Sequence, residues 1–144
     1  MAAHTTSKPD RNNCFNSGNA TAFTEQQGGS IVCTSSAAST IGERERPSYA
    51  ASKAAINSLC RHVASRWGKK GIRCNALAPG FIATETTKEN MPAEILDAML
   101  KGYNSDRHGN TLDIAAAVAF LMSDEAGWVN GQVWHINGGA YYAN

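Results

Sequence analysis

Several features that would assign a protein to a particular class are missing from this sequence of 144 residues. No apolar run approaches the ~18 residues that would cross a bilayer, and the amino terminus lacks the apolar core of a secretory signal. The four cysteines and four histidines are dispersed, without the paired short spacing of a metal site. The net charge is only +1, which favours neither nucleic acid nor an anionic membrane surface as a partner. We therefore expect a cytoplasmic protein with reduced thiols and no bound metal.

Leucine, isoleucine and valine are absent from residues 1–29, where Asn, Thr, Ser and Gly predominate. Such a stretch buries too little apolar surface to offset the entropy of ordering the chain. We predict that residues 1–27 are a polar, poorly ordered segment and that residues 28–144 form one domain. The hydrophobic content of 42% and charged content of 17% are typical of a globular protein.

The remaining sequence opens with a strand, a helix and a second strand. Residues 30–34 (SIVCT) are short, apolar and β-branched, and residues 72–78 (IRCNALA) repeat that pattern. Between them, residues 48–67 carry an apolar stripe at helical spacing. A strand–helix–strand unit of this length makes the two strands parallel with a right-handed crossover. Basic residues near positions 61–73 are interpreted as a solvated helix end.

The carboxyl-terminal part of the sequence continues the alternation. Residues 92–101 predict a short helix, and Thr111 can cap a longer one whose buried side would include Leu121 and Met122. Residues 132–136 predict a third strand, and the tail at 140–144 is expected at a subunit interface. The predicted fold class is α/β, with a partial doubly wound parallel sheet.

A possible proton-transfer site lies between the first strand and the helix. Tyr49 and Lys53 are four residues apart, so a helix places both side chains on one face. A free phenol has a pKa near ~10, and a nearby ammonium ion favours its phenolate form. Ser36 follows the first strand and could hold a substrate oxygen opposite the phenol. Because active sites of open parallel sheets lie beyond the carboxyl ends of strands, Ser36 and the Pro79-Gly80 turn are expected at one edge.

These motifs, in the order IVCTSS, YAASKAA and GIRCNALAPG, closely resemble the short-chain dehydrogenase/reductase family, with a 3-oxoacyl-reductase-like subgroup as the nearest pattern. The resemblance implies the carboxyl-terminal half of a Rossmann-type fold. It makes Tyr49 the acid/base, Lys53 the residue that assists it and binds the nicotinamide ribose, and Ser36 the substrate-orienting residue. In PGFIATET it assigns Pro79, Gly80, Ile82 and Thr84 to the nicotinamide end of the cofactor.

The implied activity is hydride transfer between NAD or NADP and a small-molecule carbonyl or secondary alcohol. The family also implies a homo-oligomer that packs the helix of residues 48–67 against its copy. The nicotinamide cofactors cannot be distinguished, because the residues that contact the adenosine ribose in the family have no counterpart here.

The sequence departs from the family upstream of residue 28. Family members begin with a strand and a TGxxxGxG loop, and neither that motif nor GxGxxG occurs here. We expect a truncated dinucleotide-binding-type catalytic domain, produced by truncation, a gene-model error or pseudogene decay.

Two other functions stay open. The chain could be a catalytically impaired fragment that acts only as an interaction or dimerisation module, because an unpaired first strand would invite self-association. A serine hydrolase using Ser35 or Ser36 with His62 or His108 is weaker, since no GxSxG elbow is present. A polar turn is the expected setting of His108.

Overall fold

Three parallel strands form a single sheet in the computed structural model, which describes residues 28–142. The order along the sheet is β1 (Gly29–Thr34), β2 (Ile72–Pro79) and β3 (Val133–Ile136). The three predicted strands and their parallel orientation are therefore confirmed. β2 lies in the centre, and β1 forms one edge of the described sheet.

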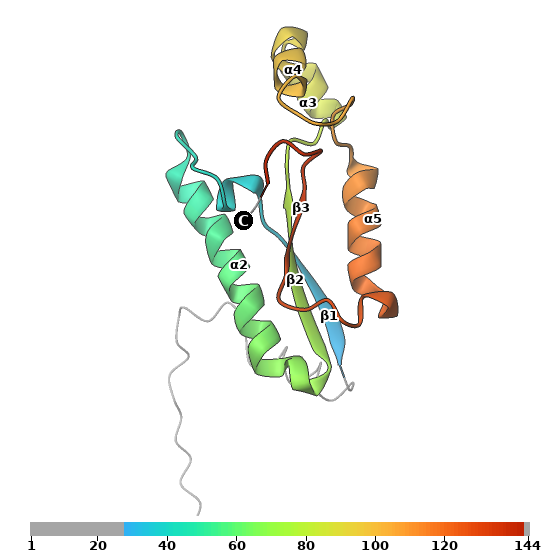
Figure 1. Cartoon of the computed structure of the whole chain (residues 1–144). Coiled ribbons are helices and arrows are strands. Elements are labelled where there is room, and N and C mark those ends of the chain that lie inside the picture. The colour runs from blue at the N-terminus through green and yellow to red at the C-terminus, as the bar shows by residue number, and fades with distance from the viewer. Residues whose placement is uncertain (1–27, 143–144) are drawn as a thin grey trace, which may run out of the picture.

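The side chains of β2 alternate between two apolar cores, one on each face of the sheet. Cys74 and Ala76 face α2 (Pro47–Trp67), whereas Leu77 faces α5 (Thr111–Met122), and all three are essentially inaccessible to solvent. Figure 1 shows α2 covering one side of the strands and α5 the other. A central strand that is buried on both faces explains why five of the seven residues at 72–78 are apolar.

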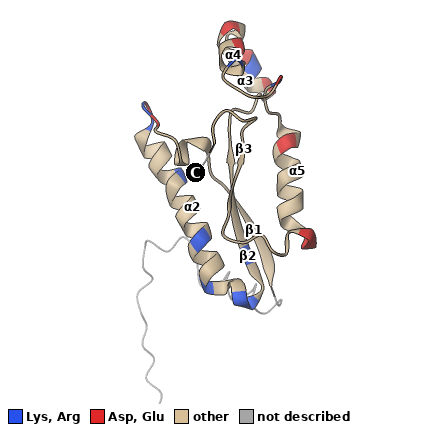
Figure 2. Ribbon diagram, in the orientation of Figure 1, with Lys and Arg blue, Asp and Glu red and all other residues tan. Residues whose placement is uncertain are grey.

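Helix α2 begins with Pro47 in its first turn and carries the predicted apolar stripe, whose members Cys60 and Val63 are fully buried. It contains Lys and Arg but no acidic residue, whereas the acidic residues of the described part of the chain lie on α3 to α5 and the segments that connect the elements, as Figure 2 shows. Arg66 lies in the last turn of α2, where a cation interacts favourably with the helix dipole.

The amino terminus of α5 is capped differently from the sequence prediction. Asn110, not Thr111, is the N-cap, and its side chain accepts hydrogen bonds from the amides of Leu112 and Asp113. The Asp113 carboxylate accepts one from the Asn110 amide, which completes a capping box. Thr111 was predicted because it also has a capping side chain, but only Asn110 has the extended backbone that a cap requires.

Two other details of the sequence interpretation are wrong at the far end of α5. Met122 is 52% exposed rather than buried, because it lies off the buried face of the last turn, which its neighbour Leu121 occupies. Arg73 is not a solvated basic residue: its guanidinium donates to the carbonyl oxygens of Leu121 and Ser123. These bonds satisfy carbonyl groups that the end of a helix leaves without intrahelical partners.

Two short helices lie beyond the carboxyl ends of the strands (Figure 1). The predicted helix at residues 92–101 is confirmed as α4 (Ala93–Leu100), but α3 (Glu85–Asn90) was not predicted. No apolar stripe marks α3 in the sequence, and it depends instead on Thr84, whose hydroxyl accepts from the Thr87 amide. The predicted polar segment at residues 1–27 lies outside the described residues. None of the described helices is long and apolar enough to cross a membrane.

Candidate active site

A cleft of roughly 800 Å³ opens at the carboxyl edge of the sheet. It brings together residues from the loop after β1, the start of α2 and the loop after β2, as expected for an open parallel sheet. Of the sequence-predicted site residues, the cleft is lined by Ser36, Tyr49, Pro79, Gly80 and Ile82. Lys53 and Thr84 are not among the residues that line the cleft, and the structure gives both of them intramolecular partners.

Ser36 is placed by the turn that ends β1. Its hydroxyl accepts a hydrogen bond from the Ala38 amide at 3.3 Å, which caps a single 3-10 turn at Ala37–Ser39. The side chain is half-buried and its oxygen borders the cleft. A hydroxyl that accepts one bond still has its proton to donate, so Ser36 can donate to a ligand oxygen.

Tyr49 lies in the first turn of α2 and is 37% exposed. The Arg46 guanidinium carbon lies 4.9 Å from the centre of its ring, and the Lys53 ammonium lies 5.6 Å from that centre. Both are distances at which a cation interacts with an aromatic face. Two cations thus lie beside the tyrosine ring, and one of them, Arg46, is paired with the Glu43 carboxylate at 2.8 Å.

Lys53 is anchored between two elements. Its ammonium donates a 2.9 Å hydrogen bond to the carbonyl oxygen of Thr34, the last residue of β1. Its own carbonyl oxygen accepts a 3.1 Å bond from the buried Ser35 hydroxyl. The two bonds tie the start of α2 to the end of β1, which sets the height of Tyr49 relative to Ser36.

Gly80 is required by packing within the chain. A Cβ at this position would lie 2.9 Å from both Cα and Cβ of Asn137, and the Gly80 amide donates to the Ile136 carbonyl oxygen. The family resemblance assigns this glycine to the nicotinamide end of the cofactor. The structure shows that Gly80 is crowded by Asn137, the residue after the end of β3.

Ile82 and Thr84 follow this turn. Ile82 forms an isolated parallel bridge with Gly109, in which the Ala83 amide donates a hydrogen bond to the Gly109 carbonyl oxygen. Within residues 28–142, the Ile82 amide itself makes no hydrogen bond. That amide is available to an acceptor in the cleft. The Thr84 hydroxyl is already engaged as the cap of α3 and contacts the Thr87 hydroxyl at 2.7 Å.

Two tyrosines in the cleft were not assigned to the site from the sequence. Burial raises the pKa of Tyr103, and burial also raises the pKa of Tyr141, whose hydroxyl lies 3.0 Å from Nδ1 of His135. Tyr103 follows α4 and Tyr141 follows β3, so both are far from Tyr49 along the chain and no local spacing connects them with it. Tyr141 lines the cleft although the tail was expected only at a subunit interface.

The histidines do not form a hydrolase site with the serines. The Ser35 and Ser36 hydroxyls bond to backbone groups, and His62 packs edge-on against Trp67 with ring centres 5.9 Å apart. His108 is not in a solvated polar turn, because its ring packs against Phe81 and Tyr103 at 5.4 and 5.9 Å between ring centres. The expectation of a plain polar histidine was therefore wrong.

Comparison with known proteins identifies relatives of this arrangement. Residues 14–141 match the family model described as enoyl-(acyl carrier protein) reductase. A 7α-hydroxysteroid dehydrogenase of Clostridium sardiniense is 42% identical over 112 residues, covering 78% of this chain and 43% of the relative. A 3-oxoacyl-(acyl carrier protein) reductase of Staphylococcus aureus is 38% identical over 116 residues, covering 81% of this chain and 47% of that protein. The chain thus spans less than half the length of these curated relatives.

Solved structures give the same result. A 7α-hydroxysteroid dehydrogenase complexed with NADH and 7-oxo glycochenodeoxycholic acid is 38% identical, with a TM-score of 0.76 over 85% of this chain and 48% of that one. A 3-oxoacyl-(acyl carrier protein) reductase from Brucella melitensis is 34% identical, with a TM-score of 0.80 over 86% of this chain and 46% of that one. Given the matched model, the shared parallel sheet and the cleft at its carboxyl edge, the chain belongs to the short-chain dehydrogenase/reductase family.

Proposed function

We propose that this chain carries the proton-transfer site of a nicotinamide-dependent oxidoreductase that interconverts a carbonyl and a secondary alcohol. The observation that carries the proposal is the convergence of Ser36 and Tyr49 on one cleft at the carboxyl edge of the sheet. Two hydroxyl groups on one cleft can hold a single substrate oxygen between them, which is the geometry that carbonyl reduction needs.

Tyr49 is the proton donor and acceptor in this proposal. Its phenol would transfer a proton to the carbonyl oxygen during reduction and take one from the alcohol during oxidation. Lys53 and Arg46 lie beside the ring. The positive charge of Lys53 would stabilise the phenolate that forms when the proton leaves, whereas Arg46 is paired with Glu43. Ser36 would donate a hydrogen bond to the same substrate oxygen and so fix its position.

NAD or NADP would supply or accept the hydride. The residues present fit the nicotinamide end of such a cofactor, because Ile82 lines the cleft and its amide has no partner within residues 28–142. That amide would bond the carboxamide, Pro79 and Gly80 would form the adjacent wall, and Lys53 would contact the ribose. Thr84 would contribute only if its hydroxyl turned from the Thr87 amide. Relatives with NADH and with NADP both occur among the similar structures, so the choice between them stays open.

Cofactor binding tests the proposal directly. Titration of the purified chain with NADH and with NADPH to millimolar concentration should give a saturable change in nicotinamide fluorescence. Ile82→Pro removes the unpartnered amide and should weaken cofactor binding. Ile95→Pro, at an exposed position of α4, is the control and should leave cofactor binding unchanged. Circular dichroism checks that both variants are folded. A chain that is folded but gives no saturable signal with either cofactor would overturn the proposal.

A second candidate is an interaction module without catalytic activity. It is favoured by the position of β1 at an edge of the described sheet, where one row of backbone groups lacks a neighbouring strand. In this reading the chain would associate with itself or another chain through β1 and α2. Concentration-dependent association in analytical ultracentrifugation, together with absence of cofactor binding, would favour this candidate over the enzyme.

A further inference from the structure

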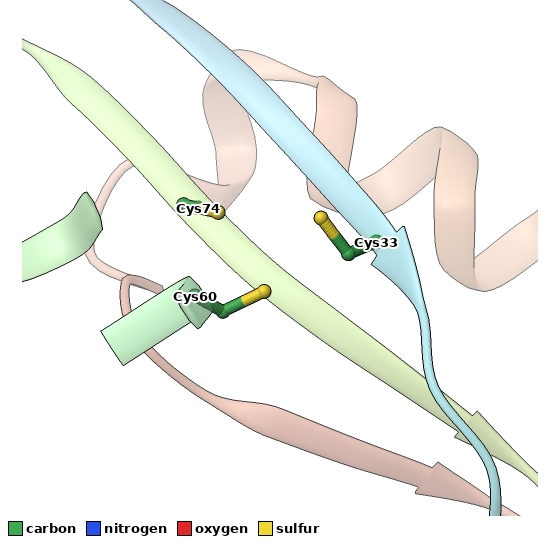
Figure 3. Close-up of side chains that lie close together, drawn as sticks. All are labelled: Cys33, Cys60 and Cys74. Atoms are coloured by element: carbon green, nitrogen blue, oxygen red, sulfur yellow. The ribbon is translucent and has the colours of Figure 1, made fainter. Parts of the chain in front are cut away.

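Three cysteines that are far apart in the sequence meet on the α2 side of the sheet. Cys33 comes from β1, Cys74 from β2 and Cys60 from α2, and their Sγ atoms all lie within 4.8 Å of one another. Figure 3 shows the three side chains extending from separate elements toward a common region. All three are free thiols. The sequence showed no such site, because the convergence depends on strand register and helix packing rather than on short spacing.

The register of the strands explains why these side chains share a face. Ile31 is the partner of Cys74 in the parallel pair, and Cys33 is two residues further along β1. Residues two apart in a strand point to the same face, so Cys33 is the diagonal neighbour of Cys74. Cys60 is packed directly above them from α2. Each thiol is therefore held by a different rigid element, which favours a preorganised site.

The spacing of the sulfur atoms suits one ion with three sulfur ligands. With metal–thiolate bonds of about 2.3 Å, three sulfurs in a trigonal plane lie about 4 Å apart. Separations of at most 4.8 Å need only a small contraction to reach that distance. Closed structural zinc sites and iron–sulfur clusters take four protein ligands. The group found among the described residues contains three, all of them sulfur.

We propose that Cys33, Cys60 and Cys74 form a three-coordinate binding site for a soft, thiophilic ion, of which cuprous copper is the best match. Thiolate ligands select Cu(I) over hard divalent cations. Cys60 and Cys74 are completely buried, whereas Cys33 is partly accessible at the edge strand and provides the route of entry.

Binding of Cu(I) to the three thiols needs no oxidant or reductant. Up to three S–H bonds break, their protons leave to solvent, and three copper–sulfur bonds form. Copper enters and stays as Cu(I), so no electron is transferred. The bound ion would join β1, α2 and β2, and it would stabilise the folded chain by mass action. The site lies in the interior between α2 and the sheet and none of its residues lines the catalytic cleft, so this inference is independent of the proposed function.

The test is anaerobic titration of the full chain with Cu(I) against bathocuproine disulfonate, followed by X-ray absorption at the copper edge. One Cu(I) per chain with three sulfur neighbours is expected. Cys33→Ser and Cys33→Ala should each lower the affinity by at least about 100-fold, beyond the range typical of outer-shell ligand partners. Cys14→Ser is the matched control, because it removes the remaining cysteine of the chain, and it should leave the affinity unchanged.

Several outcomes would overturn the inference. If a folded Cys33→Ala protein binds Cu(I) with unchanged affinity, the three cysteines are ordinary core residues and not a binding site. A loss of affinity in Cys14→Ser, or a sulfur count of two or four in the unmodified chain, would replace the three-residue site with another ligand set. Because the sulfur count is measured on the unmodified chain, it decides the matter even if a variant does not fold.

Discussion

The Lys53 ammonium is bonded to the carbonyl oxygen of Thr34 at 2.9 Å, so the cation beside Tyr49 is held by the last residue of the neighbouring strand. This contact connects the fold to the candidate chemistry. β1 delivers Thr34 and then Ser36 to the sheet edge, and α2 delivers Lys53 and Tyr49 to the same edge. A displacement of either element would therefore separate the two hydroxyls that line the cleft.

Replacing Tyr49 with phenylalanine removes the proposed proton donor while keeping the ring between its two cations. We expect Tyr49→Phe to lower carbonyl reduction by at least about 100-fold, the lower range for losing a general acid. Tyr142→Phe is the matched control, because Tyr142 is 78% exposed and lies outside the cleft lining. Steady-state oxidation of NADPH or NADH checks both variants. Near-normal activity of a folded Tyr49→Phe protein would exclude the proposed role.

Replacing Lys53 with methionine should affect both chemistry and structure. The variant loses the bond to Thr34 and the positive charge near the Tyr49 ring. We expect weaker cofactor binding, because Lys53 is the proposed contact to the nicotinamide ribose, and slower carbonyl reduction, because the cation beside the Tyr49 ring is lost. Lys88→Met, in the exposed helix α3, is the control for removal of a charge. Unchanged cofactor affinity and activity in a folded Lys53→Met protein would contradict the proposed role of Lys53.

Adding a methyl group at Gly80 should disturb the junction of β2 and β3. The new Cβ would lie 2.9 Å from Cα of Asn137, so backbone must shift, and we expect a loss of about 1–3 kcal/mol in the free energy of unfolding. Gly42→Ala is the matched control, since nothing lies within 4 Å of a Cβ there. Urea denaturation of both variants measures the difference. Equal stabilities would mean that Asn137 moves aside without cost.

The capping box of α5 should make stability depend on pH in acid. The Arg107 guanidinium and the Asn110 amide hold the pKa of Asp113 at about 2, below its ordinary value of 3.8. Because the pKa of Asp113 is lower in the folded chain than in the unfolded chain, the stabilisation by its ionised carboxylate is complete above a pH of about 3.9. It is lost as the pH falls toward 2. We expect Asp113→Asn to remove that part of the acid dependence in thermal denaturation. Glu125→Gln, which neutralises an exposed acid in the 3-10 turn Asp124–Ala126, should retain it.

Local patterns in the sequence were sufficient for most of the framework. The β-branched run at residues 30–34, the apolar stripe of residues 48–67 and the run at 72–78 each contain their own periodicity, so the strands and α2 were predicted nearly to their ends. Helix α3 was missed because it has no apolar face. Its formation depends on the Thr84 cap, which stabilises the helix relative to an extended loop.

By itself, the sequence determined the α/β class, the parallel strands and the helical spacing of Tyr49 and Lys53, because each depends on residues close together in the chain. Only the tertiary structure decided which distant groups meet. It added Tyr103 and Tyr141 to the cleft, turned Arg73 toward the end of α5, crowded Gly80 against Asn137 and brought the three cysteines together. Such contacts depend on strand register and on how the helices pack across the sheet, and neither is encoded in local spacing.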